Sequence, residues 1–348
     1  MPATRVAVIG AGSFGRNHLR VYRELQAAHP GLVELVAVVD PSEANLAQAT
    51  ERFAIPGYPT LDALLAADLH LDAASVCVPT IHHATVAEQL IAAGLDVLIE
   101  KPFAASLAEA DRILSCAHEH ARIVAVGHLE RFNPAVAATI QRLNHPMFFE
   151  AHRLSIFTAR SLDVDVVLDL MIHDLDIVLA LTNSPVKEVR AVGLPVLSHK
   201  VDIANVRVEF DSGCVANFTA SRISTEQVRK LRLFQPRQYL SLDFARQELL
   251  TIDVAGVTPE QLAMLAAGSA SRISHLASSA QHPSPGLALE KLELQRAEPL
   301  RLELEDFLQA VRHRTAPRVP GEAGRAALAL ALEINQQIAA HAHRAGLL

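Results

Sequence analysis

The sequence predicts two domains, a doubly wound parallel α/β domain followed by an α+β domain with a mainly antiparallel sheet. Three observations support this prediction. The chain has 348 residues, whereas one ordinary domain uses about 100–200. Apolar strand-like segments alternate with helix-like segments as far as residue 127, which is typical of a parallel sheet. Consecutive strand-like segments follow from residue 186 to residue 252, which indicates antiparallel pairing.

The composition excludes several classes of partner. The chain carries 31 Lys and Arg against 38 Asp and Glu, a net charge of −7, so neither nucleic acid nor an anionic membrane surface is expected as the main partner. Twelve Phe, three Tyr and no Trp leave few rings for base stacking. Cys77, Cys116 and Cys214 are widely spaced and odd in number, as in a reducing compartment. No run of 18 apolar residues occurs, and we expect a cytoplasmic protein.

A glycine motif follows the first strand-like segment, residues 5–9. It reads Gly10-Ala11-Gly12-Ser13-Phe14-Gly15 and leads into a helix-like segment, residues 16–28. The first glycine would permit a tight turn, the second would let the backbone approach a diphosphate, and the third would let the helix pack on the strand. The helix start would supply N–H donors to the phosphates. The alternative is a plain glycine-rich turn, but its position between a strand and a helix favours dinucleotide binding.

The second strand-like segment, residues 33–39, ends in Asp40. A carboxylate at about this distance from the glycine motif accepts hydrogen bonds from the adenosine ribose. Asp40 therefore predicts NAD as the cofactor, because a carboxylate would repel the 2′-phosphate of NADP and no Arg or Lys follows at once. The alternative role for Asp40 is capping the next helix.

The alternation continues to the end of the first domain. The expected strands are 72–78, 96–99 and 122–126, and the expected helices are 82–93 and 106–120. Val78-Pro79-Thr80 and Glu100-Lys101-Pro102 each come where a strand ends. Ligands of such sheets bind outside the carboxyl ends of the strands, so both tripeptides are predicted to lie near the nicotinamide.

The pattern changes after residue 127. The expected helices are 134–143 and 166–181, and the expected strands are 147–154, 186–192, 204–210, 215–221, 230–234, 239–243 and 248–252. Residues 256–286 are rich in Ala, Ser, Gly and Pro and predict an irregular segment with one weak helix at 260–267. Helices at 300–312 and 321–342 close the chain. We expect domains at 1–127 and 128–300, with the helices of 301–348 packing back on the first.

Two groups could carry proton transfer. Lys101 follows a strand end at the expected crevice, although an isolated lysine there is often only solvated. Asp169 and His173 are four residues apart on a predicted helix and would share one face, where the carboxylate could fix the imidazole tautomer. The alternative is a buried histidine with a structural partner, and Asp174 or Asp176 could orient it instead. The chain has no H-E-x-x-H motif, P-loop or Tyr-x-x-x-Lys pair, which leaves hydride transfer without a metal.

These motifs together resemble the Gfo/Idh/MocA oxidoreductase family over nearly the whole chain. The resemblance implies a Rossmann domain, then an open-faced antiparallel sheet that often mediates oligomers, here a dimer or tetramer. It also implies Lys101 and His173 as acid/base candidates, with Asp169 in support. The residues expected to bind NAD are Gly10, Gly12, Ser13, Phe14, Gly15, Asp40, Val78, Pro79, Thr80, His83, Glu100 and Lys101.

Within the family, residues 127–134 and 163–176 resemble bacterial enzymes that oxidise C3 of UDP-N-acetylglucosamine. The resemblance implies a nucleotide-sugar substrate, a partner aminotransferase and a product used in lipid A or other surface glycans. The residues expected to contact the substrate are Arg131, Asn133, Arg160, Asp174, Arg222, Arg229 and Lys230. Oxidation of another sugar or polyol is the alternative reaction, and a non-catalytic NAD sensor is the alternative outside enzymes.

Overall fold

The computed structural model describes residues 2–157, 164–254 and 288–346. The chain forms two compact units. The first comprises Met1–Phe132 and Ala297–Leu330, and the second comprises Asn133–Arg296 and Ala331–Leu348. Helix α10 (Gly321–Arg344) contributes residues to both. No described helix is long and apolar enough to cross a membrane.

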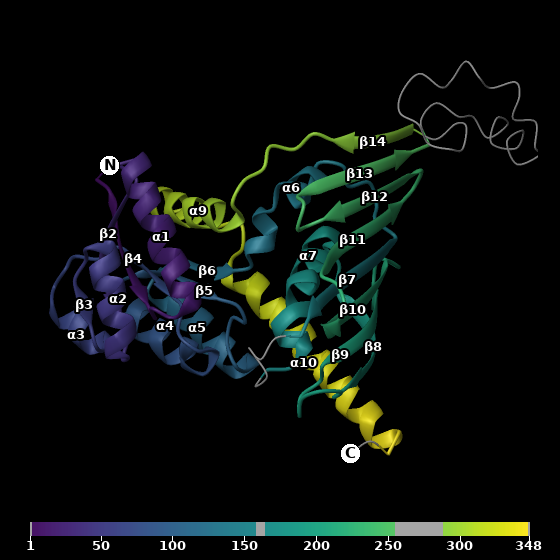
Figure 1. Ribbon diagram of the computed structural model, residues 1–348, viewed down its shortest axis with the longest axis horizontal. Helices are drawn as coiled ribbons and strands as arrows, with labels where there is room; N and C mark the ends of the chain where they lie inside the picture. Colours follow the sequence, from purple (N-terminus) through teal and green to yellow (C-terminus); the bar gives the residue numbers. More distant parts are fainter. Residues whose placement is uncertain (1, 158–163, 255–287, 347–348) are drawn as a thin grey trace, which may run out of the picture. The chain divides into compact units, whose positions relative to one another are not determined.

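The first unit is built on a six-stranded parallel sheet in the order β3-β2-β1-β4-β5-β6 (Figure 1). Helices lie on both faces, as a doubly wound sheet requires. The strands are β1 (Thr4–Ile9), β2 (Val33–Val39), β3 (Gly57–Tyr58), β4 (Ala73–Val76), β5 (Asp96–Glu100) and β6 (Val124–Gly127). The helices are α1 (Ser13–Ala28), α2 (Glu43–Phe53), α3 (Leu61–Ala66), η1 (Thr80–His82), α4 (His83–Ala92), α5 (Leu107–Glu119), η2 (Leu129–Phe132) and α9 (Pro299–His313).

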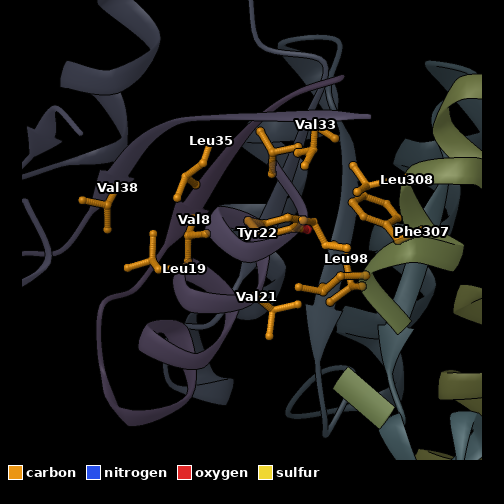
Figure 2. Packing of buried hydrophobic residues seen from close by; sticks show 14 of the residues in the cluster. Val8, Leu19, Val21, Tyr22, Val33, Leu35, Val38, Leu98, Phe307 and Leu308 are labelled. Atoms are coloured by element: carbon orange, nitrogen blue, oxygen red, sulfur yellow. The ribbon is translucent and has the colours of Figure 1, made fainter. Parts of the chain in front are cut away.

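The core of this unit explains why the strands are almost wholly apolar. Both faces of a parallel sheet are covered, so alternate side chains have no exposed side to occupy. Val8 and Leu98 of the sheet pack with Tyr22 of α1 and Phe307 of α9 in one buried cluster (Figure 2). The Tyr22 hydroxyl is hydrogen-bonded to the Ser75 hydroxyl at 2.8 Å, which satisfies the one polar atom that the ring carries into the core.

The second unit is built on an eight-stranded sheet in the order β14-β13-β12-β11-β7-β10-β9-β8. The strands are β7 (Phe148–Ile156), β8 (Val186–Leu194), β9 (Ile203–Phe210), β10 (Val215–Ser224), β11 (Val228–Gln235), β12 (Gln238–Asp243), β13 (Glu248–Asp253) and β14 (Ala288–Leu292). The helices are α6 (Pro134–Ile140), a π-helical turn η3 (Val167–Met171) and α7 (Ile172–Thr182). Helices α6 and α7 lie on one face of the sheet (Figure 1).

The sheet is antiparallel except at its centre, where β7 pairs parallel with β10. Helix α7 lies between β7 and the later strands in sequence and allows this parallel pairing, because a crossover is needed for two strands to run in the same direction. Alternate residues are buried under the helices, as in β9, where Ala204, Val206 and Val208 are buried and Asn205 and Arg207 are exposed. The other face therefore carries polar side chains.

The structure adds elements that the sequence did not predict. Helix α3 and the strands β3 and β14 were not expected, and α2 was expected only as the helix that Asp40 could cap. The single helix expected at 166–181 is instead a π turn, η3, followed by α7. In the π turn the N–H of Ile172 donates to the carbonyl of Val167, five residues back. The weak helix expected at 260–267 lies outside the described residues.

Candidate functional site

The glycine motif forms the connection between β1 and α1. Gly10 has φ +99°, which favours glycine, and a Cβ there would lie 2.7 Å from the carbonyl oxygen of Cys77. A Cβ on Gly15 would lie 1.8 Å from the carbonyl oxygen of Gly10. Both glycines are thus required by the close packing of loop, strand and helix. A Cβ on Gly12 would meet no atom within 4 Å, so backbone at this position is open to a ligand.

The start of α1 fits a diphosphate. Gly12 is the N-cap residue, no side chain caps the helix, and its first turn holds no acidic residue. The first N–H groups of a helix carry a positive dipole end, and here no carboxylate of the helix competes for them. Ser13 and Phe14 of this turn are exposed. The residues of the loop therefore fit the diphosphate of a dinucleotide.

Asp40 lies directly after β2 with its carboxylate against the glycine loop. Its Oδ2 accepts the N–H of Ala11 at 2.7 Å, and its Oδ1 accepts the N–H of Ser42 at 2.9 Å. The side chain is 7% exposed. Each carboxylate oxygen can accept more than one hydrogen bond, so Asp40 can hold the loop and still accept from a ribose hydroxyl. Ser42, not Asp40, is the N-cap residue of α2.

The two predicted tripeptides both follow the carboxyl ends of parallel strands. Val78, Pro79 and Thr80 come after β4, and Lys101 and Pro102 come directly after β5. Because β4 and β5 are neighbours in the sheet, their ends meet at one edge, which is also the edge of the glycine loop. Lys101 is half-buried there.

His83 lies beneath these two tripeptides and is 1% exposed. Its Nε2 is 3.0 Å from the carbonyl oxygen of Val78, and its Nδ1 is 3.0 Å from that of Pro102. Burial lowers the pKa of His83, against the opposing effects of these carbonyls and of Glu100. Both ring nitrogens thus face the backbone of the tripeptides, which assigns the imidazole to the support of this edge.

Asp169 and His173 belong to the second unit, whereas Lys101 belongs to the first. Asp169 lies in the π turn and His173 in the first turn of α7, and both are half-buried. Asp165 caps this segment, because its Oδ1 accepts the N–H of Val167 at 2.9 Å and the N–H of Leu168 at 3.0 Å. Single π turns inside helices are frequent at functional sites.

Asp174, expected to contact the substrate, is engaged by a residue that the sequence analysis missed. Arg153 of β7 donates from Nε to its Oδ2 at 2.9 Å and from an Nη to its Oδ1 at 2.7 Å. Both side chains are about 4% exposed. Arg153 has the strand parity of the buried Phe149 and Ala151, and this charge at an inward position is the signal that could have indicated a buried partner.

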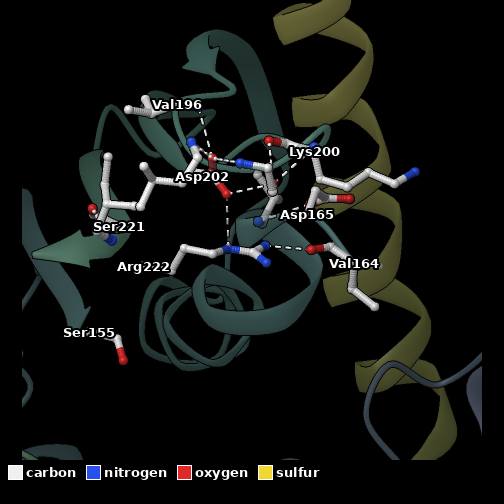
Figure 3. Close-up of polar contacts among 12 residues, drawn as sticks. Ser155, Val164, Asp165, Val196, Lys200, Asp202, Ser221 and Arg222 are labelled. Atoms are coloured by element: carbon white, nitrogen blue, oxygen red, sulfur yellow. Dashed lines mark hydrogen bonds and ion pairs between the residues drawn. The ribbon is translucent and has the colours of Figure 1, made fainter. Parts of the chain in front are cut away.

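Arg222, the second predicted substrate contact, is also buried and paired. Its guanidinium donates to the carbonyl of Val164, and its Nε is 3.6 Å from Oδ1 of Asp202 (Figure 3). Asp202 in turn accepts the N–H groups of Val196, Leu197 and Ser198 at 2.7–2.8 Å. This arrangement holds the connection between β8 and β9 in place, and contact of Arg222 with a substrate diphosphate stays a prediction.

The remaining predicted contacts are divided. Asn133 is buried, caps α6 by accepting the N–H of Ala135 at 3.1 Å, and donates to the carbonyl of Phe244 at 3.0 Å. Lys230 is exposed, whereas its neighbour Leu231 is buried. Strand alternation therefore places Lys230 on the open face of the sheet, away from α7. Substrate contact by these two residues stays a prediction. Arg131 and Arg229 are half-buried, and Arg160 lies outside the described residues.

Metal binding and thiol chemistry are the other two possibilities for the described residues. The described residues hold no group of three His, Cys, Asp or Glu side chains that could bind a metal ion. Cys77, Cys116 and Cys214 are free thiols. Burial raises the pKa of Cys77, with Glu100 and Glu303 acting in the same direction, which disfavours the thiolate form.

Comparison with known proteins agrees with this geometry. Residues 4–128 match the oxidoreductase family model with an NAD-binding Rossmann fold, and residues 136–236 match the Gfo/Idh/MocA C-terminal domain. The chain is 35% identical to UDP-N-acetylglucosamine 3-dehydrogenase from Acidithiobacillus ferrooxidans over 98% of this chain and 99% of that protein.

A solved structure of the same Acidithiobacillus enzyme superimposes with a TM-score of 0.85 at 34% identity, covering 98% of this chain and 99% of the other. The chain is also 32% identical to inositol 2-dehydrogenase from Acidothermus cellulolyticus, over 55% of this chain and 57% of that protein. The chain therefore belongs to the Gfo/Idh/MocA family of oxidoreductases, and its first domain is an NAD-binding Rossmann domain.

Proposed function

We propose that the protein oxidises the C3 hydroxyl of UDP-N-acetylglucosamine to a ketone, with NAD as the hydride acceptor. The observation that carries this proposal is the extent of the likeness. Identity of 35% to a UDP-N-acetylglucosamine 3-dehydrogenase runs through 98% of the chain and so includes the second domain, whereas the likeness to inositol 2-dehydrogenase covers 55%. A substrate is selected by the site and not by the fold.

Each part of the first domain has a proposed task toward the cofactor. The N–H groups at the start of α1 bind the diphosphate, and Asp40 accepts from the adenosine ribose. The backbone after β4 and the segment around Lys101 line the nicotinamide end. When bound, NAD⁺ accepts the hydride that leaves C3 of the sugar. The protein's own residues position the C3–H bond and remove the proton of the C3 hydroxyl.

Lys101 and His173 are the two candidates for the base that takes this proton. A base of this kind contributes about 10²–10⁴-fold to the rate. Asp169, four residues before His173, supports the imidazole in this proposal. Removing each candidate separates their roles, because loss of the base abolishes one limb of the pH profile of kcat whereas loss of a positioning group lowers kcat at every pH.

The substrate's diphosphate needs cations despite the protein's negative charge. Arg131 and Arg229 remain proposed for this role, since they are half-buried and Arg222 is committed to Asp202. With few aromatic residues in the chain, we propose that uracil is held by hydrogen bonds and aliphatic contacts more than by stacking.

We propose a cytoplasmic protein, because the free thiols suit a reducing compartment. We also propose a homo-oligomer, a dimer or tetramer, because α6 and α7 cover only one face of the second sheet. A C3 ketone is a substrate for transamination, so an aminotransferase that installs a 3-amino group is the proposed pathway partner. The amino sugar would enter lipid A or another surface glycan.

A substrate panel tests the proposal. NADH fluorescence is recorded in single-turnover and steady-state reactions with UDP-N-acetylglucosamine, UDP-glucose, N-acetylglucosamine and myo-inositol, so that a retained cofactor is also detected. We expect the highest kcat/KM with UDP-N-acetylglucosamine. A higher value with the free sugar or inositol would replace the substrate assignment. NADH binding without turnover of any of the four would favour the sensor.

A further inference from the structure

A buried pair of polar side chains lies directly behind Lys101. His18, on α1, is fully buried, and Glu100, the last residue of β5, is 7% exposed. The Nε2 of His18 is 2.8 Å from Oε1 of Glu100. A buried carboxylate is retained only when hydrogen-bonded partners compensate for its lost hydration. The pair joins the helix that follows the dinucleotide loop to the strand that precedes the proposed base.

The seat of the Glu100 carboxylate is shaped by a third element. Glu100 pairs with Gly127 in the ladder between β5 and β6. A Cβ on Gly127 would lie 2.8 Å from Oε1, 2.9 Å from Oε2 and 2.9 Å from Cδ of Glu100. Contacts below 3.0 Å force one group to move, and here the carboxylate end of Glu100 would have to move. The carboxylate is therefore held between the imidazole and the backbone of β6.

Fixing Glu100 has a consequence for the next residue. Successive side chains of a strand point to opposite faces of the sheet. Glu100 and Leu98 share the face covered by α1, because Leu98 packs in the cluster that contains Tyr22 and Glu100 contacts His18. Lys101 follows Glu100 directly, so its backbone begins at the residue that His18 holds. If the Glu100 side chain rotated away from His18, the backbone at Lys101 would turn with it.

The same imidazole is linked to the dinucleotide loop. The ring of Phe14, which lies in the glycine motif, has its centroid 5.7 Å from that of His18, and the ring of Tyr22 lies 6.4 Å away on the other side. Phe14 is 38% exposed, so its ring is partly open to solvent while it contacts His18. Contacts therefore run from the loop through His18 and Glu100 to the residue before Lys101.

We propose that His18 and Glu100 are positioning residues that set the orientation of Lys101 relative to the dinucleotide loop. The inference rests on the proposed function in one respect, that Lys101 acts on the substrate. Neither residue takes part in proton transfer with the sugar. Misplacing a reacting group by about 1 Å can cost 10²-fold in rate, so a displaced Glu100 should lower kcat far more than it weakens the binding of NADH.

Four variants of the full-length protein test this. His18→Leu removes the hydrogen bond, His18→Gln restores a nitrogen near the position of Nε2, and Gly127→Ala displaces the carboxylate from the other side. Gly324→Ala is the matched control, since its Cβ would meet the Val126 side chain of the same strand at 2.6 Å and leave Glu100 untouched. If added bulk on β6 or α10 lowered kcat simply through steric strain, kcat would fall equally in both glycine variants.

We expect kcat to fall about 10- to 100-fold in His18→Leu and Gly127→Ala, with the Kd for NADH changed less than about 3-fold, a small effect beside that loss. His18→Gln and Gly324→Ala should retain most of kcat. If His18→Leu does not fold, Gly127→Ala against Gly324→Ala carries the comparison. Equal losses of kcat and NADH affinity, or unchanged kcat in Gly127→Ala, would overturn the proposal.

A second measurement does not depend on the sugar. The acetylation rate of Lys101 by acetic anhydride is measured by mass spectrometry in the NADH-bound protein, with the exposed Lys200 as internal standard. We expect a changed relative rate in His18→Leu and Gly127→Ala, and none in Gly324→Ala. Lack of turnover with a changed labelling rate would refute the proposed substrate alone. An unchanged acetylation rate of Lys101 in both His18→Leu and Gly127→Ala would refute the positioning role.

Discussion

Replacing Asp40 by asparagine should weaken the binding of NAD and leave the fold intact. The two oxygens of Asp40 each accept a backbone N–H, from Ala11 and from Ser42. A carboxamide has one accepting oxygen, so one of these N–H groups then faces an NH₂ group. The ribose loses a charged acceptor at the same time. A hydrogen bond to a charged group is worth about 1.5–3 kcal/mol, which corresponds to about 10- to 150-fold in Kd.

The assay is fluorescence titration of NADH and NADPH without sugar, so the result is independent of the substrate. We expect the Kd for NADH to rise by about 10- to 150-fold in Asp40→Asn, while the Kd for NADPH stays the same or falls because a repulsive charge is gone. Asp72→Asn is the control, since Asp72 accepts the N–H of Arg5 at 2.7 Å near the amino ends of β1 and β4. Its Kd for NADH should not change.

Two results would refute this reasoning. The first is an Asp40→Asn protein that binds NADH as tightly as the parent, because the carboxylate would then act only on the loop. The second is a parent protein that binds NADPH more tightly than NADH. Either result would remove Asp40 from the ribose site, and the second would also reverse the choice between the two nicotinamide cofactors.

Three further predictions concern the base and two buried ion pairs. Lys101→Met should lower kcat by at least about 10²-fold and raise the calorimetric Kd for NADH much less, because the diphosphate and ribose contacts proposed for the cofactor lie at other residues. Arg153→Met leaves the Asp174 carboxylate buried without its cation and should reduce the free energy of unfolding by about 3–5 kcal/mol in urea titrations, and adding Asp174→Leu should restore much of it. Burial raises the pKa of Asp202, but the Ser198 hydroxyl and three backbone N–H groups outweigh it and lower that pKa to about 2. The folded pKa of Asp202 lies below the unfolded value of 3.8, so its ionised carboxylate stabilises the fold by about 2 kcal/mol. This stabilisation is present above pH 4 and is lost as the pH falls toward 2. The unfolding of Asp202→Asn should lack this part of the acid dependence.

The features that the sequence predicted well depend on short stretches of chain. The glycine motif lies between β1 and α1, and Asp40 follows β2, the next strand, as the sequence predicted. Their contacts with NAD stay predictions. The alternation of strands and helices likewise predicted the parallel sheet, which the structure confirms with its order β3-β2-β1-β4-β5-β6. The family and its NAD-binding domain are confirmed by the matching models.

The features that were missed depend on contacts between distant parts of the chain. Asp174 and Arg222 were expected to contact a substrate, and the sequence pattern did not indicate their buried partners, Arg153 and Asp202. A charge in sequence does not reveal whether it points to solvent, to ligand or to a buried partner. Strand parity could have indicated that Lys230 lies on the open face of the sheet, because it alternates with the buried Leu231. The π turn before α7 has no signal in the apolar pattern, because that pattern does not distinguish it from an α-helical turn.

The central claim is the transfer of hydrogen from C3 of the sugar. UDP-N-acetylglucosamine carrying deuterium only at C3 tests it directly, with mass spectrometry of the NADH formed in one turnover. Oxidation at C3 predicts NADH that carries one deuterium and a 3-keto sugar that carries none. It also predicts a slower hydride-transfer step than with the unlabelled sugar. Unlabelled NADH formed alongside a sugar that keeps its deuterium would place the oxidation at another carbon and contradict the account.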